Sequence, residues 1–289
     1  MSQDPHSRTL IIGGGITGLS AAYELVRLGR PAVLIEEQPR LGGVIQTETV
    51  DGCVLEQGPD SFLSAKPAAA ELIRELGLGG EIIASNDDSR VTYVVRNGRL
   101  VPLPDGLMMM VPTRIMPVAA SSLLGWATKV RMGLEYLHKP PAARVERSVG
   151  EFIREHYGAE TVDYLAEPLL SGVYGGDVER LSVDSVLARF VEIEAKYGSL
   201  TKGVLAARKA AAGRGASAPL FQTMKGGLAQ LTAELERRIR PHCQLVHHRV
   251  DAIERTSAGL WRARAGGEWI EAGNLIFACP AYAEIGRAP

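Results

Sequence analysis

The sequence contains few cysteines, and their spacing excludes a cysteine-based metal site and a Cys-x-x-Cys redox site. Cys53, Cys243 and Cys279 are the only cysteines among 289 residues. No two of them form a Cys-x-x-Cys pair or any other spacing typical of metal ligands. The pattern therefore predicts no metal site, and it favours a reduced, cytosolic setting in which the thiols are buried.

An excess of either charge is also missing. The chain has 32 Lys and Arg residues against 33 Asp and Glu residues, which gives a formal net charge of −1. Such a balance gives no general attraction to nucleic acid or to anionic membranes, so we expect no nucleic-acid partner. The basic segment 202–214 is interpreted first as a solvated helix face, with a lipid-binding surface as the alternative.

Long apolar runs and a secretion signal are absent as well. Charged residues and prolines interrupt the most apolar stretch, 103–130, and the first ten residues lack the apolar core of a signal peptide. We expect a cytoplasmic protein, with peripheral contact on the inner face of the cell membrane as an alternative. The methionines at 108–110, 116 and 132 are interpreted as adaptable core, with a lipophilic channel or a membrane-facing surface as the other reading.

A glycine motif between a predicted strand and a predicted helix is the most informative feature present. Residues 8–18 read RTLIIGGGITG. Gly13 allows a tight turn, Gly15 leaves room for a pyrophosphate, and Gly18 lets the helix pack closely on the strand. The motif predicts a dinucleotide whose phosphates lie on the helix N-terminus.

An acidic residue and a second glycine pair follow this motif. Glu36 ends a predicted strand over 32–36, where a carboxylate accepts hydrogen bonds from a ribose diol. Arg40 and the pair Gly42-Gly43 come one short loop later, and a simple nicotinamide dehydrogenase has no use for them there. We interpret the pair as a close backbone approach to the second half of FAD, with Arg40 as a phosphate cation. A surface turn is the alternative.

Periodicity and turn residues predict the remaining elements. His247 and His248 would be neighbours on one strand and point to opposite faces, so we interpret both as structural. The predicted elements are helices over 16–28 and 67–77, a hairpin of 91–95 and 99–102, a mostly helical region over 103–213 with a helix capped by Ser182, strand 221–224, a helix with Leu228, Leu231, Leu235 and Ile239 on one face, strand 244–253, a hairpin of 261–265 and 268–272, and strand 275–279.

Several motifs together resemble a known family. The pattern Glu36-x-x-x-Arg40-x-Gly42-Gly43 followed by EQGP at 56–59 resembles the FAD-dependent amine oxidase superfamily, which includes desaturases and porphyrinogen oxidases. The stretches GPDSF at 58–62, EPLLSGVYGGDVERLS at 167–182 and FQTMKGGLAQL at 221–231 are similar to oxygen-dependent protoporphyrinogen oxidases and bacterial coproporphyrinogen oxidases. Many amine oxidases have arginine directly after the paired glycines, where this chain has Val44.

The resemblance, which extends over nearly the whole chain, implies the fold class and the domain organisation. We expect an α/β protein with a Rossmann-like FAD-binding domain of the amine oxidase type, split between 1–89 and 220–289. A largely helical insertion at 90–219 would face the substrate or a membrane. The family continues beyond the position of Pro289, so we expect the rest of the substrate domain and the last FAD contact to be missing. A non-catalytic nucleotide-binding fragment is therefore an alternative.

The resemblance also implies an activity. The expected reaction oxidises protoporphyrinogen IX or coproporphyrinogen III to the porphyrin in haem biosynthesis, removing six electrons in three flavin cycles, with O2 as acceptor and H2O2 as product. The flavin carries this chemistry, and the sequence offers no catalytic triad or carboxylate pair. Another amine oxidase or a carotenoid desaturase is the alternative. The sequence leaves the preferred porphyrinogen and the oligomeric state open.

The resemblance assigns site residues by position. The expected FAD contacts are Gly13, Gly15, Gly18, Glu36, Arg40, Gly42, Gly43, Gly58, Pro59 and Val250. The expected substrate contacts are Arg90, placed to meet a propionate, and Gly172, Gly175 and Gly176 in a loop above the macrocycle.

Overall fold

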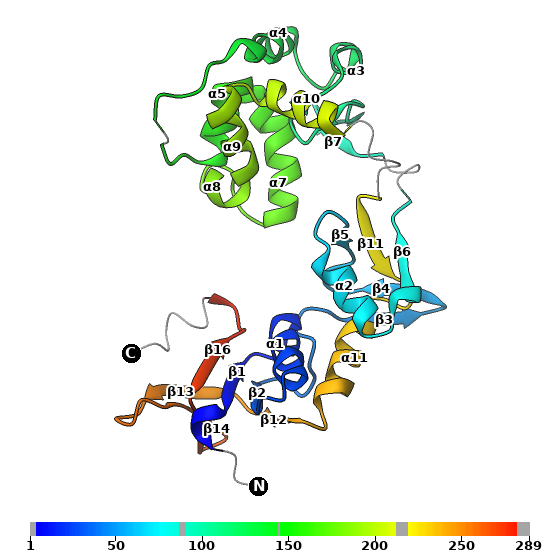
Figure 1. Ribbon diagram of the computed structural model, residues 1–289. Helices are drawn as coiled ribbons and strands as arrows, with labels where there is room; N and C mark the ends of the chain where they lie inside the picture. The colour runs from blue at the N-terminus through cyan, green and yellow to red at the C-terminus, as the bar shows by residue number, and fades with distance from the viewer. Residues whose placement is uncertain (1–3, 87–90, 144, 212–218, 282–289) are drawn as a thin grey trace. The chain divides into compact units, whose positions relative to one another are not determined.

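The computed structural model describes residues 4–86, 91–143, 145–211 and 219–281. The chain divides into two compact units (Figure 1). The first unit combines residues 1–87 with residues 218–289, and the second consists of residues 88–217. The second unit is thus an insertion between two segments that fold together.

A parallel four-stranded sheet forms the centre of the first unit. Its strands lie in the order β12, β2, β1, β16, and β1 pairs in register with both β2 and β16. Every residue of β1 is buried, which is typical of a parallel sheet that is covered on both faces. The strand bounds are β1 Thr9–Ile12, β2 Ala32–Glu36, β12 Cys243–His247 and β16 Asn274–Phe277.

Two different layers cover this sheet. Helices α1 (Ile16–Arg27) and α11 (Ala229–Ile239) pack on the face that carries Ile11. Leu10 belongs to the cluster on the other face, which an antiparallel sheet covers. Neighbouring strand residues point to opposite faces, so the uninterrupted apolar run of β1 serves both layers. The antiparallel strands are β13 Val250–Arg255, β14 Trp261–Ala265 and β15 Glu268–Ala272.

The remaining elements of the first unit are short, and η1 among them lies against β15. Strand β11 pairs with β5 and β6, and β3 pairs with β4 as a hairpin. The bounds are η1 Pro5–Ser7, β3 Thr47–Val50, β4 Cys53–Glu56, β5 Phe62–Leu63, α2 Ala68–Glu75, η2 Gly79–Glu81, β6 Ile82–Ala84 and β11 Phe221–Met224.

The second unit is mainly helical around a core of its own. Phe152, Ile153 and Tyr157 of α5 are fully buried in it. Helix α5 begins with a capping box between Ser148 and Glu151. The bounds are β7 Tyr93–Arg96, β8 Arg99–Pro102, β9 Leu107–Met108, β10 Val111–Pro112, α3 Ile115–Ala120, α4 Trp126–Leu134, η4 Glu135–Leu137, α5 Val149–Tyr157, α6 Ala159–Thr161, η5 Val162–Ala166, α7 Glu167–Tyr174, α8 Val183–Val186, α9 Ala188–Tyr197 and α10 Leu200–Ala211.

A buried polar network joins four elements of the second unit. The His156 ring on α5 lies between two carboxylates, with Nδ1 3.0 Å from Glu135 Oε1 and Nε2 3.1 Å from Glu194 Oε1. Burial pushes the pKa of Glu135 up, but hydrogen bonds from His156 and from the N-terminus of α10 outweigh burial and lower the pKa to about 2. Glu135 therefore serves as an ionised cap for α10.

Two predicted elements are wrong in their extent. The single strand expected over 244–253 is two strands, because the chain leaves the parallel sheet after His247 and β13 pairs with β14 instead. The helix expected from Ser182 breaks at Leu187 into α8 and α9, and the Ser182 side chain makes no capping hydrogen bond.

Burial corrects two further predictions. Of the cysteines only Cys243 is buried, which raises the pKa of its thiol to about 11, whereas Cys53 is exposed. The methionines divide in the same way. Met110 and Met132 lie in the core, while the others of that group are exposed. No helix in the described ranges has the length and apolarity that crossing a bilayer demands.

Candidate nucleotide site

A cavity of about 500 Å³ lies where β1 and β2 end and α1 begins. This is the carboxyl edge of the parallel sheet, the usual ligand position in such folds. Backbone and side chains from five segments line it. They include Gly13, Gly15, Ile16, Thr17, Glu36, Gly42, Gly43, Val44, His248, Val250 and Cys279.

The turn from β1 into α1 requires glycine at two positions. Gly13 has φ +108°, and a Cβ there would lie 2.6 Å from the carbonyl oxygen of Ala278. A Cβ on Gly18 would lie 1.9 Å from the carbonyl oxygen of Gly13. A side chain on Gly18 would push the helix away from the strand, and a side chain on Gly13 would collide with the backbone that follows β16, so the two glycines together fix this turn.

Gly15 opens onto the cavity instead. It is the N-cap of α1 and offers no side-chain acceptor to the first-turn N–H groups. Within 4 Å a Cβ on Gly15 would meet only the Cα of Gly43, at 3.9 Å. The free space beside Gly15 therefore belongs to the cavity, and the helix N-terminus faces it without a side-chain cap, an arrangement that suits a bound phosphate.

The second glycine pair contacts the first motif directly. The Gly42 N–H donates to the Gly14 carbonyl oxygen at 2.8 Å, and Gly15 and Gly42 form a bridge. A Cβ on Gly43 would lie 3.0 Å from the Cα of Gly15. The structure thus brings the two glycine segments to one wall of the cavity.

Glu36 lies at the end of β2 on the cavity wall. Its Oε2 accepts the Gly14 N–H at 2.6 Å, and its Oε1 accepts the Gln38 N–H at 2.9 Å. A carboxylate has about four acceptor positions. Two remain after these bonds, so the held carboxylate can still accept both hydroxyls of a ribose.

Arg40 lies outside the cavity lining and supports the glycine loop. Its Nη2 donates to the Gly43 carbonyl oxygen at 2.7 Å and to Gln46 Oε1 at 2.8 Å. Gly58 lies close against the same loop, because a Cβ there would lie 2.0 Å from the Val44 carbonyl oxygen. Pro59 follows it directly in the chain. Contact of these residues with a cofactor stays a prediction.

Two strand-end residues complete the lining. Val250, the buried first residue of β13, lines the cavity. His248 lines it too, which the structural interpretation of this histidine missed. The error follows from the wrong strand assignment, since His248 stands in the link between two sheets. The signal in the sequence was the His-His-Arg turn after a short apolar strand.

The candidate substrate residues lie elsewhere in the chain. Gly172 is within α7 with open space around it, and Gly175, at φ +63°, ends that helix. A Cβ on Gly176 would lie 3.0 Å from the Leu181 side chain. Arg90 lies outside the described residues. Substrate contact by all four stays a prediction.

The residues present fit a flavin dinucleotide. The cavity volume is within the range of about 300–1,000 Å³ usual for ligand sites. Its wall offers donors at the N-terminus of α1, an acceptor in Glu36, and glycines where any Cβ would narrow the space. Gly13, Gly15, Glu36, Gly43 and Val250 would hold the dinucleotide.

Comparisons with known proteins identify the family of the chain. The model of the family described as flavin containing amine oxidoreductase matches residues 16–283. Coproporphyrinogen III oxidase of Bacillus subtilis (strain 168) is 37% identical over 246 residues, covering 82% of this chain and 52% of the relative. Protoporphyrinogen oxidase 2 of Arabidopsis thaliana is 31% identical, covering 71% of this chain and 40% of the relative.

Solved structures show the same fold. A crystal structure from Exiguobacterium sp. 255-15, assigned to protoporphyrinogen oxidase, has a TM-score of 0.81 at 30% identity and covers 97% of this chain and 61% of that chain. Cyclohexylamine oxidase from Brevibacterium oxydans IH-35A has a TM-score of 0.65 at 20% identity, covering 99% and 61%. The chain spans about half the length of the curated relatives it matches.

Proposed function

The chain belongs to the family of flavin-containing amine oxidoreductases, with FAD as cofactor, and from this premise we propose that it oxidises a porphyrinogen to the porphyrin. The proposed substrate is coproporphyrinogen III or protoporphyrinogen IX, and the proposed acceptor is O2. The proposed place of the reaction is haem biosynthesis.

One observation carries the proposal. The relative with 37% identity over 246 residues is a coproporphyrinogen III oxidase, and the matched region spans 82% of this chain. The amine oxidase of solved structure is only 20% identical, which supports the shared fold alone. Val44 is consistent with this choice, because many amine oxidases have arginine directly after the paired glycines. The exposed Val44 side chain instead presents an apolar group beside Gly43 on the cavity wall.

The chain's own residues would hold and shield the cofactor. When bound, FAD supplies two-electron oxidation, so removal of six electrons needs three rounds, each yielding H2O2 from O2. Glu36 would fix the ribose, and the N-terminus of α1 would neutralise the pyrophosphate. The apolar β1 and β2 ends would keep water from that half of the site.

We propose that Arg90 meets a substrate propionate. A carboxylate that enters a pocket of low dielectric constant loses hydration and needs a cation in exchange. The planar guanidinium suits a carboxylate better than an ammonium group does. The assignment comes from the position of Arg90 just before the YVVR strand, which matches the family.

Steady-state oxidation of both porphyrinogens tests this function, with flavin content measured on every sample. The chain extended to the length of its relatives should form porphyrin with O2 uptake and H2O2 release. Arg90→Ala should raise KM about tenfold or more, for a lost charge-assisted contact of about 1.5–3 kcal/mol, and Arg90→Lys should recover part of the loss. Arg99→Ala, an exposed arginine on β8, is the matched control. An unchanged KM for Arg90→Ala at full flavin loading would show that Arg90 is a surface charge.

A cytoplasmic location with peripheral membrane contact is the further part of this proposal. The membrane contact is supported by large apolar side chains exposed on α3 and α4. The side chains with the largest exposed fractions there are Ile115, Met116 and Trp126. Exposed apolar patches of this kind mark interaction surfaces.

A further inference from the structure

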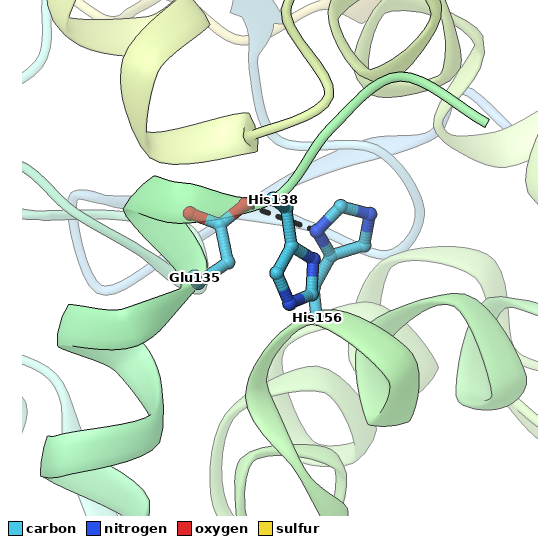
Figure 2. A group of neighbouring side chains, drawn as sticks. All are labelled: Glu135, His138 and His156. Carbon is cyan, nitrogen blue, oxygen red and sulfur yellow. Dashed lines mark hydrogen bonds and ion pairs between the residues drawn. The ribbon is translucent and has the colours of Figure 1, made fainter.

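A second cluster of chemically active side chains lies in the helical unit, outside the nucleotide cavity. The ligand-capable atoms of Glu135, His138 and His156 lie within 4.8 Å of one another (Figure 2). We propose that these three residues bind a divalent transition-metal ion, with Zn²⁺ as the ion that suits them. Two imidazoles and one carboxylate are an established ligand set for this ion, with the fourth position left to water.

The short helix η4 aligns two of the ligands. Glu135 and His138 are three residues apart, and the His138 N–H donates to the Glu135 carbonyl oxygen at 2.9 Å. Residues three apart in a 3₁₀ turn project in the same direction. Gly198 holds the chain after His138, because a Cβ there would lie 2.2 Å from the carbonyl carbon of Lys139.

Hydrogen bonds from the start of α10 hold the Glu135 carboxylate in a fixed orientation, as neighbouring hydrogen-bond donors hold the carboxylate ligands of metal sites. Its Oε1 accepts the Leu200 N–H at 2.6 Å, and its Oε2 accepts the Ser199 hydroxyl at 2.9 Å and the Thr201 N–H at 3.2 Å. The remaining lone pair of Oε1 faces Nδ1 of His156. Carboxylate ligands in metal sites are held by similar hydrogen bonds.

His156 is oriented by a second carboxylate. Its Nε2 lies 3.1 Å from Glu194 Oε1, an arrangement that leaves Nδ1 as the ligand atom when Nε2–H is the donor. Nδ1 lies 3.0 Å from Glu135 Oε1, and a metal ion would take the place of the proton that joins these two atoms. Two ligands of one tetrahedral zinc ion are separated by about 3.3–3.5 Å, so the pair must open by only a few tenths of an ångström.

His138 is the exposed ligand of the three. Its ring lies 5.3 Å from the His156 ring, centroid to centroid, and within the described part of the chain its ring nitrogens make no hydrogen bond. The χ2 torsion of histidine has a broad distribution, so a turn about it can bring a ring nitrogen toward the other two ligand atoms. It also leaves a path from solvent to the buried pair.

The charge of the network favours a divalent ion. Arg147 pairs with Glu194 and with the exposed Glu155. Inside the unit, Glu135 and Glu194 flank the His156 ring, and Arg147 offsets one of the two carboxylates. A cation at Glu135 would offset the other, in a place where unpaired charge is most costly.

Zinc titration of the purified, untagged and chelator-treated protein tests the site. We expect one Zn²⁺ to bind, and Co²⁺ in its place to give the visible absorption of a four-coordinate ion. His138→Ala should weaken Zn²⁺ binding by more than the about 10–100-fold that loss of an outer-shell partner costs, and should abolish the cobalt signal. His242→Ala, an exposed histidine outside both sites, should bind like the unaltered protein.

Thermal melting supplies a second readout. Zn²⁺ should raise the melting temperature of the unaltered protein and of the His242→Ala variant, and should leave that of His138→Ala unchanged. His138→Gln replaces His138→Ala if circular dichroism shows that the alanine variant is unfolded. Equal zinc affinity of the His138 variant and the unaltered protein would overturn the proposal, as would no binding by the unaltered protein. Either result would mean that the contact between His156 and Glu135 is a hydrogen bond only and not a metal site.

Discussion

Glu36 is the residue on which recognition of the nucleotide depends most. Its carboxylate is held by the Gly14 and Gln38 N–H groups and keeps two acceptor positions toward the cavity. Glu36→Ala should weaken FAD binding about tenfold to a hundredfold, because a hydrogen bond to a charged group contributes about 1.5–3 kcal/mol. Retention of flavin absorbance on serial dilution measures this loss.

The matched control is Glu48→Ala, which removes an exposed carboxylate on β3. It should retain flavin like the unaltered protein. Flavin occupancy of Glu36→Ala that matches the control at every dilution would show that this carboxylate does not contact the cofactor.

For single residues, the sequence predicts a role correctly when that role depends only on neighbours in the chain. Gly13 and Gly18 were predictable because a strand, a tight turn and a helix are adjacent in sequence. His248 was not, because its place on the cavity wall depends on the chain leaving one sheet for another. The contacts of Arg40 with its own loop were equally hidden, since a cation beside glycines suits a phosphate as well as a carbonyl oxygen.

Among the elements, helix α6 connects two others through one side chain. Glu160 accepts the Gly125 N–H before α4 at 2.9 Å and Arg96 Nη2 of β7 at 2.7 Å. Burial raises the pKa of Glu160, but the hydrogen bonds from Thr128, Gly125 and Arg96 outweigh burial and lower it below the ordinary value. Glu160→Gln should therefore lower the free energy of unfolding. The expected decrease is toward the lower end of about 1.5–3 kcal/mol, because the site is partly solvated.

The pH dependence of this loss has a definite sign. A carboxyl group with a lowered pKa in the folded state stabilises the fold above its ordinary pKa of 4.5. That contribution is lost as the pH falls through the lower folded pKa. Denaturant titrations should show a constant difference between the unaltered protein and Glu160→Gln above about pH 5, and a shrinking difference below about pH 4.5. Exposed Glu192→Gln is the control, and a difference independent of pH would contradict the ionic role.

Elements closed by local turns were predicted well, and elements set by distant partners were not. The hairpin of β14 and β15 has the predicted bounds, because Gly266-Gly267 at positive φ closes it locally. The break between β12 and β13 depends on pairing with β2 and β14, which the local apolar pattern does not encode. At the break between α8 and α9, Leu187 has φ −123° and ψ 33°, outside the helical region, and its side chain is buried in the core of the second unit.

After the second unit, the chain comes back and completes the first unit. Strand β11 pairs with β5 and β6, and β12 and β16 extend the sheet begun by β1 and β2. The sequence indicates this return through the strand at 221–224 and the amphipathic helix after it. The network of Glu135, His156 and Glu194 gave no such signal, because its members come from three separate elements and only folding brings them together.

The most direct test of the proposed function is anaerobic mixing of the FAD-loaded protein with coproporphyrinogen III, with a primary amine as the parallel substrate. Absorbance follows the flavin, and fluorescence follows the porphyrin. The proposed function predicts that the porphyrinogen removes the oxidised-flavin absorbance and that porphyrin fluorescence appears when O2 is admitted, while the amine leaves the flavin oxidised. An unchanged flavin spectrum with the porphyrinogen, together with reduction by the amine, would contradict it.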